Sequence, residues 1–321
     1  MKAQSQPAGF GQWSSYWASG ALTSLPQDFA LNYDGEVAAF WIERFTEAPS
    51  PGRLLDVCSG NGPIALLAAE WAERQARRLE IDAVDAAFPQ PDRVPGLSDA
   101  QRGLLQRIRF VGGTRVESLP FAEATFDLVC SQYGIEYCDP DESAQEVVRV
   151  LRPGGLLAVV SHEADSAMMQ TMRDELAAYD ALERSRLPRL MRSWGRGQLG
   201  DREFIRSTEQ ALRALRTARD AASQSPLVTQ VLQAVVGLLQ LQPRLMRQQS
   251  EAVANYADQL RAGRARLDDM LRVNRRIAEN PDWHMSFVQA GLVLRSSRPL
   301  VYAGKHAMGR CLEWIKPMDI G

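Results

Sequence analysis

"LLDVCSGNGPIALLAAEWAE", residues 54–73, contains the change of pattern that decides the fold. Its opening apolar run is typical of a buried strand, and the Ala, Leu and Glu content after Pro63 is typical of a helix. Between them, the Ser-Gly-Asn-Gly turn has two glycines, which leave the backbone accessible because they carry no Cβ. This succession predicts a βα unit whose turn contacts a ligand. The alternative is an ordinary strand-to-helix turn without a ligand.

Residues 51–164 contain five apolar segments that alternate with segments of helix length. Each is rich in Val, Ile and Leu and is bounded by turn residues, as in strands that are buried on both faces of a parallel sheet. The alternation predicts an α/β fold with a doubly wound, mostly parallel sheet. The expected strands are RLLDVC (53–58), LEIDAVD (79–85), RIRFVGG (107–113), FDLVCSQY (126–133) and GLLAVVSHE (155–163).

Residues 165–280 have no strand pattern. Ala, Leu, Gln, Arg and Glu dominate this segment, and apolar residues recur three or four positions apart, which predicts helices. Four or five helices are expected, because prolines divide the segment at Pro188, Pro226, Pro243 and Pro281.

Strand patterns return in residues 281–321, as LVLRSSRPLVYAG and GRCLEWIKP. Two further strands would complete a seven-stranded sheet. We therefore predict a Rossmann-like core at 51–164 with a large all-helical insertion, 165–280, between strands 5 and 6. Residues 1–50 are expected to form an N-terminal segment and a helix from about 34 to 47.

The formal net charge of −2 is unevenly distributed. Residues 1–164 contain 13 Lys/Arg and 22 Asp/Glu, whereas 165–280 contain 19 arginines, no lysine and 14 acidic residues. The chain has no stretch of about 18 uncharged apolar residues, and its first residues lack the apolar run of a signal peptide. We therefore expect no membrane span and a cytoplasmic location. Four cysteines without a CxxC spacing argue against a metal site and against a disulfide framework.

Further residues identify the ligand of the glycine turn. A Walker loop is excluded because Gly-Lys-Ser/Thr is missing, and Ala65 replaces the third glycine of a dinucleotide fingerprint. Asp85 ends the second expected strand, where a carboxylate can accept hydrogen bonds from a ribose diol. Together with VESLPFAEATFDLV (116–129) and EVVRVLRPGGLLAVV (146–160), these features resemble the class I S-adenosylmethionine-dependent methyltransferases. The resemblance covers residues 34–163 and the two terminal strands.

The resemblance implies S-adenosylmethionine as the cofactor and a role for each matching position. Asp56 and the glycine turn would hold the methionine moiety, Asp85 would bind the ribose hydroxyls, and Ala86, Val116 and Glu117 would lie along the adenine. The end of the fourth strand would meet the sulfonium, and Trp17 or Tyr16 would close over the cofactor, with simple packing of these rings as the alternative. The implied cofactor residues are Tyr16, Trp17, Asp56, Cys58, Ser59, Gly60, Gly62, Asp85, Ala86, Val116, Glu117, Ser131 and Gln132.

Two positions depart from the family pattern. Cys58 stands where the family usually has its first glycine, and a small side chain could fit there. Arg115 stands where an aspartate usually reads the adenine amino group. We therefore expect the backbone of Val116, rather than a side chain, to recognise adenine.

Three residues are candidates for catalysis of methyl transfer. The reaction mainly requires alignment of donor and acceptor and exclusion of water, but an oxygen acceptor also needs a base. His162, which follows the fifth strand, is the candidate base, with a surface or capping histidine as the alternative. Tyr133 could wall the site and Glu136 could orient a substrate amine or hydroxyl. Alternatively, Glu136 caps the next helix.

The helical segment is expected to form a lid that selects the substrate. Its arginines could bind a carboxylate, a phosphate or RNA, and its apolar residues could line a pocket or form a homodimer interface. The alternative is that the arginines lie on solvated faces and the apolar residues form a core between the helices. We predict a methyltransferase that acts on a small, partly apolar molecule, with an acid group as one possible feature. The overall charge argues against nucleic acid. The alternatives are an RNA or protein methyltransferase and a cofactor-binding protein without catalysis.

Overall fold

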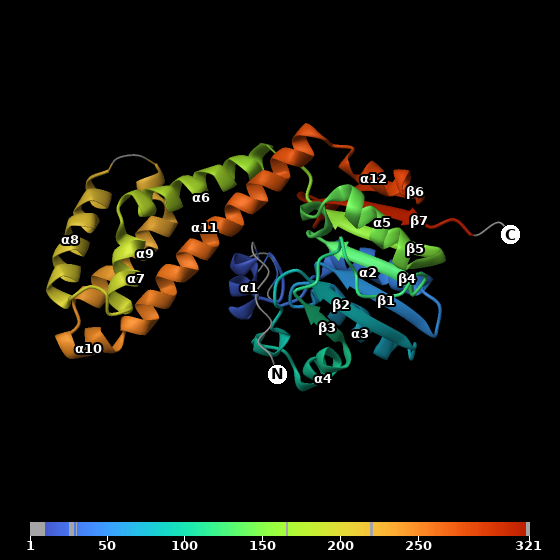
Figure 1. Ribbon diagram of the computed structural model, residues 1–321, viewed down its shortest axis with the longest axis horizontal. Coiled ribbons are helices and arrows are strands. Elements are labelled where there is room, and N and C mark those ends of the chain that lie inside the picture. Colours follow the sequence, from blue (N-terminus) through green and yellow to red (C-terminus); the bar gives the residue numbers. More distant parts are fainter. Residues whose placement is uncertain (1–9, 26–28, 30, 165, 219–220, 319–321) are drawn as a thin grey trace. The chain divides into compact units, whose positions relative to one another are not determined.

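The computed structural model describes residues 10–25, 29, 31–164, 166–218 and 221–318 (Figure 1). The chain forms two compact units. The α/β unit contains Met1–Glu163 and Val273–Gly321, and the helical unit contains Ala164–Arg272.

The α/β unit is built on a seven-stranded sheet with the order β3-β2-β1-β4-β5-β7-β6. All strands from β1 to β5 pair in parallel, and β7 is antiparallel to both of its neighbours. The prediction of a mostly parallel, seven-stranded sheet is therefore confirmed. The strands are β1 (Gly52–Val57), β2 (Leu79–Asp85), β3 (Arg109–Gly112), β4 (Phe126–Gln132), β5 (Leu151–Ser161), β6 (Val293–Tyr302) and β7 (His306–Ile315).

This strand order defines where a ligand can bind. The chain progresses from β1 through β2 to β3 on one side and from β4 to β5 on the other. The order thus reverses between β1 and β4, and in open α/β sheets ligands bind beyond the carboxyl ends of the strands at such a point. The glycine turn leaves β1 at this edge.

Helices cover both faces of the sheet (Figure 1). α3 (Pro63–Arg74) packs with α2 (Gly35–Glu47) and α4 (Asp99–Arg107), and α5 (Pro140–Val150) packs with α12 (Ser286–Gln289). The helix predicted at 34–47 corresponds to α2.

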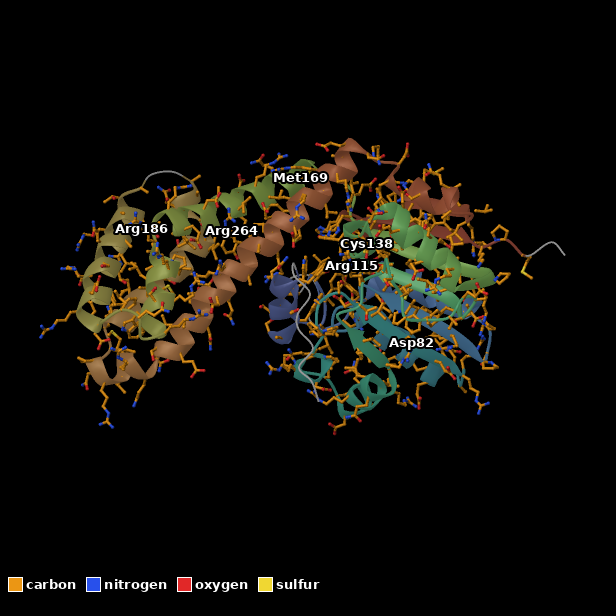
Figure 2. The ribbon with its side chains drawn as sticks, in the orientation of Figure 1. Asp82, Arg115, Cys138, Met169, Arg186 and Arg264 are labelled. Carbon is orange, nitrogen blue, oxygen red and sulfur yellow. The ribbon has the colours of Figure 1, made fainter. Side chains whose placement is uncertain are left out.

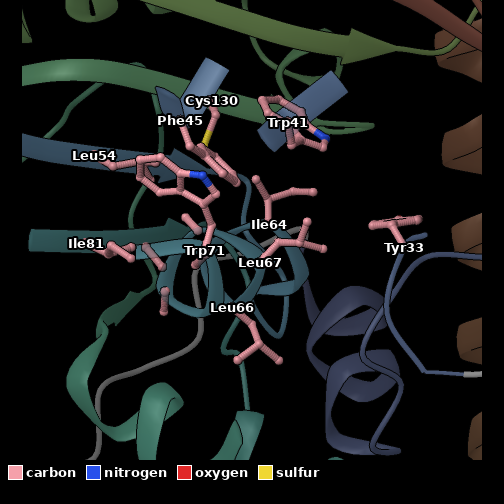
Figure 3. Packing of buried hydrophobic residues seen from close by; sticks show 14 of the residues in the cluster. Tyr33, Trp41, Phe45, Leu54, Ile64, Leu66, Leu67, Trp71, Ile81 and Cys130 are labelled. Atoms are coloured by element: carbon pink, nitrogen blue, oxygen red, sulfur yellow. The ribbon is translucent and has the colours of Figure 1, made fainter. Parts of the chain in front are cut away.

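The core beneath α3 is apolar and rich in aromatic residues. Figure 3 shows Trp71 of α3 with Phe45 of α2 and with Leu54 and Ile81 of the sheet. The rings of Phe45 and Trp71 lie 6.0 Å apart. Burial of these side chains, at about 1.5–3 kcal/mol each, fixes α3 and hence the turn that precedes it.

The helical unit has a separate apolar core. Trp194 and Phe204 stack at 4.5 Å in a cluster that includes Val231 and Leu260. Its helices are α6 (Ser166–Arg184), α7 (Leu187–Gly195), α8 (Asp201–Thr217), α9 (Pro226–Leu239), α10 (Pro243–Gln248) and α11 (Ser250–Glu279), with the short η3 (Ala222–Gln224) before α9.

One expectation about this segment needs correction. Within the described part of residues 165–280 there are six α-helices, rather than four or five. The break between α6 and α7 lies at Pro188 as expected, but α7 and α8 are separated by residues 196–200, and α10 and α11 by Gln249, where no proline stands. By packing, the helical unit ends at Arg272, whereas α11 continues to Glu279.

Candidate functional site

The glycine turn is held in a conformation that favours glycine. Cys58, Gly60 and Gly62 have φ values of 55°, 52° and 78°, all in the left-handed region. The Ser59 N–H donates to the carbonyl of Val84 at 3.0 Å, which attaches the turn to β2. Cys58 adopts its left-handed conformation despite its Cβ, so the departure from glycine is tolerated at the cost of some backbone strain.

Asp85 anchors the turn from the end of β2. Its Oδ2 accepts the Gly60 N–H at 2.8 Å, and its Oδ1 accepts the Ala87 N–H at 2.7 Å. The residue is 9% exposed, and burial raises the pKa of its carboxyl despite these two donors. Each carboxylate oxygen has a second lone pair, so Asp85 can still accept hydrogen bonds from a ligand.

Asp56 faces helix α3 rather than the turn. Its Oδ2 accepts the Ala65 N–H at 3.2 Å in the first turn of α3. Burial, with a smaller contribution from the charge of Asp85, raises the pKa of Asp56 to about 8. This contact explains why an acid precedes the turn, because it satisfies an N–H that has no partner within the helix.

The N-terminal segment lies against the glycine turn through Trp17. A Cβ at Gly60 would come within 2.4 Å of the Trp17 ring, which belongs to α1 (Gly11–Ala18). Trp17 therefore contacts the turn. Tyr16 donates its hydroxyl to the carbonyl of Thr23 at 2.9 Å, within the N-terminal segment itself.

Sequence reasoning missed Asn61, which attaches this segment to the turn. Its side chain is fully buried, and its Nδ2 donates to the carbonyls of Trp17 at 2.9 Å and Ala21 at 2.7 Å. Its Oδ1 accepts the Gln90 N–H at 2.7 Å. An asparagine between two glycines was the available signal, because a buried amide must find several partners.

The second glycine also lies against an aromatic ring. A Cβ at Gly62 would come within 2.6 Å of the Phe110 ring in β3. The sequence predicts close approach of a ligand at both glycines. In the structure, Gly60 also leaves room for the ring of Trp17, and Gly62 leaves room for the ring of Phe110.

The expected adenine edge contains Ala86, Val116 and Glu117. Ala86 is half-buried and Val116 is 2% exposed. Burial favours the neutral form of Glu117, but its hydrogen bond with Arg115 outweighs this, together with the Asp139 N–H at 3.0 Å, and its pKa is lowered. Arg115 is thus the ion-pair partner of Glu117, with the two groups 3.1 Å apart.

Ser131 and Gln132, at the end of β4, each form a hydrogen bond with another part of the α/β unit. Ser131 is fully buried, and its Oγ accepts the Ile135 N–H at 3.1 Å, which shapes the chain after β4. Gln132 accepts the Trp41 indole N–H through Oε1 at 2.5 Å. Its buried Nε2 has no hydrogen-bond partner among the described residues.

His162 and Glu136 form a dyad at the carboxyl end of β5. Nδ1 of His162 lies 2.7 Å from Oε1 of Glu136, and the same oxygen accepts the His162 backbone N–H at 2.8 Å. Glu136 is 1% exposed. With Glu136 as a carboxylate, which only accepts, a neutral His162 would carry its proton on Nδ1 and would keep the Nε2 lone pair free. Glu136 does not cap α5; that role belongs to Asp139, which accepts N–H groups of Asp141 and Glu142.

Aromatic rings enclose the dyad histidine. The His162 ring lies 4.8 Å from that of Tyr133 and 6.0 Å from that of Tyr137, and Tyr137 in turn lies 5.8 Å from Trp13 of α1. Tyr133 donates its hydroxyl to the carbonyl of Met308 at 2.5 Å, so its ring position is fixed. Such a wall excludes water and suits an apolar or cationic group.

Two cysteines meet beside the dyad. Sγ of Cys58 and Sγ of Cys138 lie 3.8 Å apart, and neither forms a disulfide. Their separation in the sequence, 80 positions, gave no signal of this contact. Figure 2 labels Cys138 near Arg115 and away from Asp82, which lies farther along the strands.

Other parts of the chain offer less for chemistry. Within the described ranges, no three His, Cys, Asp or Glu side chains gather as metal ligands would, and no helix combines the length and apolar character needed to cross a bilayer. A cavity of about 230 Å³ is lined by the end of α2 and the starts of β4 and β5, including Arg44, Asp127 and Gly155. It therefore belongs to the amino end of the strands, remote from the glycine turn.

Comparison with known proteins identifies a domain. Residues 55–159 match the family model described as "Methyltransferase domain". The matched range begins in β1 and ends in β5, so it contains the glycine turn, Asp85 and Glu136.

Individual relatives cover parts of the chain. A malonyl-[acyl-carrier protein] O-methyltransferase of Pseudescherichia vulneris is 26% identical over 53% of this chain and 64% of that protein. The ubiquinone/menaquinone biosynthesis C-methyltransferase UbiE of Geotalea daltonii is 30% identical over 42% of this chain and 56% of that protein. The chain thus spans less than two thirds of the length of these relatives. A solved putative sarcosine dimethylglycine methyltransferase from Galdieria sulphuraria has 15% identity and a TM-score of 0.38, covering 88% of this chain and 84% of that chain.

Proposed function

We propose, from the match of residues 55–159 to a methyltransferase domain, that this chain is a class I S-adenosylmethionine-dependent methyltransferase that transfers a methyl group to a small, partly apolar molecule. The cofactor supplies the methyl as an electrophile. The chain aligns the acceptor, excludes water and accepts a proton. The observation that carries the acceptor class is the buried Glu136–His162 dyad.

The residues at the carboxyl ends of β1, β2 and β4 fit the cofactor. Asp85 retains lone pairs for a ribose diol, and the left-handed turn from Cys58 to Gly62 presents its backbone to the methionine moiety. Ser131 and Gln132 would meet the amino-acid end, where the Nε2 of Gln132 can donate to a carboxylate. Trp17 would lie over the turn.

The contacts of Asp56 and Arg115 refine these roles. Asp56 would act on the methionine moiety indirectly, by fixing the start of α3 behind the turn. With Arg115 paired to Glu117, the adenine edge consists of Ala86, the buried Val116 and the aliphatic part of Glu117.

The dyad favours an acceptor that must lose a proton. His162 would use Nε2 as the base, while Glu136 holds the ring and stabilises the imidazolium that forms. Such an acceptor is a hydroxyl or an acidic carbon. A neutral amine or a carboxylate already has a free lone pair and needs no base for attack. Tyr133 would form part of the wall and would not transfer a proton, since its hydroxyl is bound to Met308.

The segment after β5 is proposed as the lid that selects the substrate. The chain leaves the α/β unit directly after His162, so this segment begins at the rim of the site. Several of its arginines are paired with acids, as in Arg196–Asp258 at 2.7 Å and Arg264–Asp180 at 2.8 Å. This pairing favours a small-molecule acceptor over RNA, since the paired guanidinium groups are less available to phosphates.

Calorimetry with S-adenosylmethionine, together with mass spectrometry of small molecules that remain bound through purification, tests the proposal. We expect saturable binding of one cofactor per chain and a strongly weakened affinity in Asp85→Ala. Asp99→Asn, an exposed carboxylate of α4, serves as the control and should bind normally. Absence of cofactor binding by the folded wild-type protein would contradict the proposal.

A further inference from the structure

Cys58 and Cys138 connect the glycine turn to the segment that carries Glu136. Cys58 follows β1, and Cys138 directly follows η2 (Ile135–Tyr137). Their sulfur atoms, 3.8 Å apart, are in van der Waals contact, and a disulfide requires about 2.05 Å. A relative movement of about 1.8 Å would therefore close the bond.

We propose that Cys58 and Cys138 form an oxidisable thiol pair, and that hydrogen peroxide or a related hydroperoxide converts them to a disulfide that lowers methyl transfer. The covalent site stands on the thiol geometry alone. Its effect on turnover rests on the proposed function.

The oxidation balances with peroxide as the oxidant. One cysteine, as its thiolate, attacks a peroxide oxygen, the O–O bond breaks, and a sulfenic acid forms with release of water. The second thiol attacks the sulfenic sulfur, forms the S–S bond and releases a second water. Two thiols and one H₂O₂ give one disulfide and two water molecules.

Cys58 and Cys138 are both half-buried, so either can be the first attacker and the other can close the disulfide. The hydrogen bond with Cys138, followed by burial and the charges of Asp85 and Glu136, raises the pKa of the Cys58 thiol well above its ordinary value. Cys130 and Cys311 are fully buried, so peroxide should reach them least.

Packing decides which segment moves when the bond forms. A Cβ at Gly134 would come within 2.2 Å of the Cβ of Cys58, so the chain after β4 already lies directly against the Cys58 side chain. Because Gly134 holds Cys58 in place, we expect Cys138 to be the residue that moves when the disulfide forms. Arg276 donates to the carbonyls of both Glu136 and Cys138, so these two residues share an anchor. Displacement of Cys138 would disturb Glu136, and through it the Nδ1 contact of His162.

This mechanism predicts a larger effect on turnover than on cofactor binding. A displacement of about 1 Å in a catalytic group can lower the rate about a hundredfold. We expect the oxidised protein to lose turnover by about ten- to a hundredfold, while its affinity for S-adenosylmethionine changes by less than about threefold. Reduction by dithiothreitol should restore the rate.

The test is treatment of the full chain with a small excess of hydrogen peroxide, followed by peptide mapping and activity measurement. We expect a peptide containing Cys58 linked to one containing Cys138, with Cys130 and Cys311 still free. Cys138→Ser should keep its reduced activity within about twofold and should resist peroxide, whereas Cys311→Ala, the control, should respond like wild type.

Two results would overturn the inference, and each separates it from the proposed function. Free thiols at positions 58 and 138 after oxidation would remove the disulfide, whether or not the chain is a methyltransferase. An equal loss of turnover in Cys138→Ser would show that peroxide acts elsewhere. A linked pair in a chain without methyl transfer would retain the thiol site and reject only the proposed function.

Discussion

The two units of the chain place their ionisable groups in different surroundings. In the α/β unit, Asp56 and Glu136 are each 1% exposed and are bound to backbone N–H groups or to His162. In the helical unit, the pair Arg196–Asp258 has side chains that are 53% and 39% exposed. Burial can shift the pKa of a carboxyl group, and hydrogen bonds fix its geometry, whereas exposed ion pairs are screened by water. The difference supports the proposal that the chemistry takes place at the sheet edge, although the arginines are concentrated in the helical unit.

The largest effect is expected from His162→Ala. Loss of a positioned base lowers turnover by about 10²- to 10⁴-fold, while cofactor affinity should change little. Single-turnover methyl transfer with the native substrate, beside a cofactor titration, measures both quantities. His306→Ala, an exposed histidine at the turn between β6 and β7, is the matched control. Normal turnover in His162→Ala would remove the dyad from the mechanism and leave the α/β unit with a binding role only.

Asp85→Ala should weaken cofactor affinity by about ten- to a hundredfold, since a charged hydrogen bond is worth about 1.5–3 kcal/mol. The variant also leaves the N–H groups of Gly60 and Ala87 without their acceptor, which should cost about 1–3 kcal/mol of stability for each. Calorimetry and urea unfolding separate the two losses. Asp258→Ala, in the helical unit, should change neither quantity by as much. If both variants lowered affinity and stability equally, the buried carboxylates of the α/β unit would not differ in importance from the exposed ones of the helical unit.

The raised pKa of Asp56 predicts that the stability of the protein depends on pH. Its pKa in the folded protein is about 8, above the unfolded value of about 3.9, so the folded state binds the additional proton between these limits. Its contribution to stability is therefore complete below about pH 4 and falls by about 1.4 kcal/mol per pH unit up to about pH 8. Asp56→Asn lacks this slope and should gain stability relative to wild type as the pH rises. Urea unfolding between pH 5 and 8 measures it.

Asp99→Asn provides the comparison for that series. Its carboxylate is exposed, so its removal should leave the slope of the wild type intact. Parallel pH profiles for wild type and Asp56→Asn would show that Asp56 is ionised in the folded protein at neutral pH.

The smallest effect is expected from Arg196→Ala. An exposed ion pair contributes about 0–1 kcal/mol, so unfolding free energy should fall by less than about 1 kcal/mol and less at high salt. A double-mutant cycle with Asp258→Ala isolates the pair. A larger coupling energy between Arg196 and Asp258 would mean that exposed ion pairs contribute substantially to the stability of the helical unit.

The sequence predicted the centre of the sheet because β1, β2, β4 and β5 are largely buried and therefore mostly apolar. Asp85 and the glycine turn were visible for a similar reason, since each stands where a predicted strand ends. The partners were not predictable. Glu136 meets His162 across 26 positions, and Asn61 meets Trp17 across 44, and neither contact follows from a local pattern. The number of helices was underestimated because two breaks contain no proline: α7 ends at Gly195 before α8 begins at Asp201, and α10 ends at Gln248 before α11 begins at Ser250.

Because of helix α11, the helical unit cannot be deleted without damage to the α/β unit. It runs through the contact boundary at residues 272 and 273, so the compact units do not coincide with separable modules. A chain spliced from Glu163 directly to Val273 would restart inside a helix and would expose N–H groups that now bond to preceding carbonyls. The remaining turns, residues 273–279, are too short to persist alone. Arg276 would then lose the scaffold from which it holds the carbonyl of Glu136, so removing the helical unit would damage the dyad without altering either of its residues.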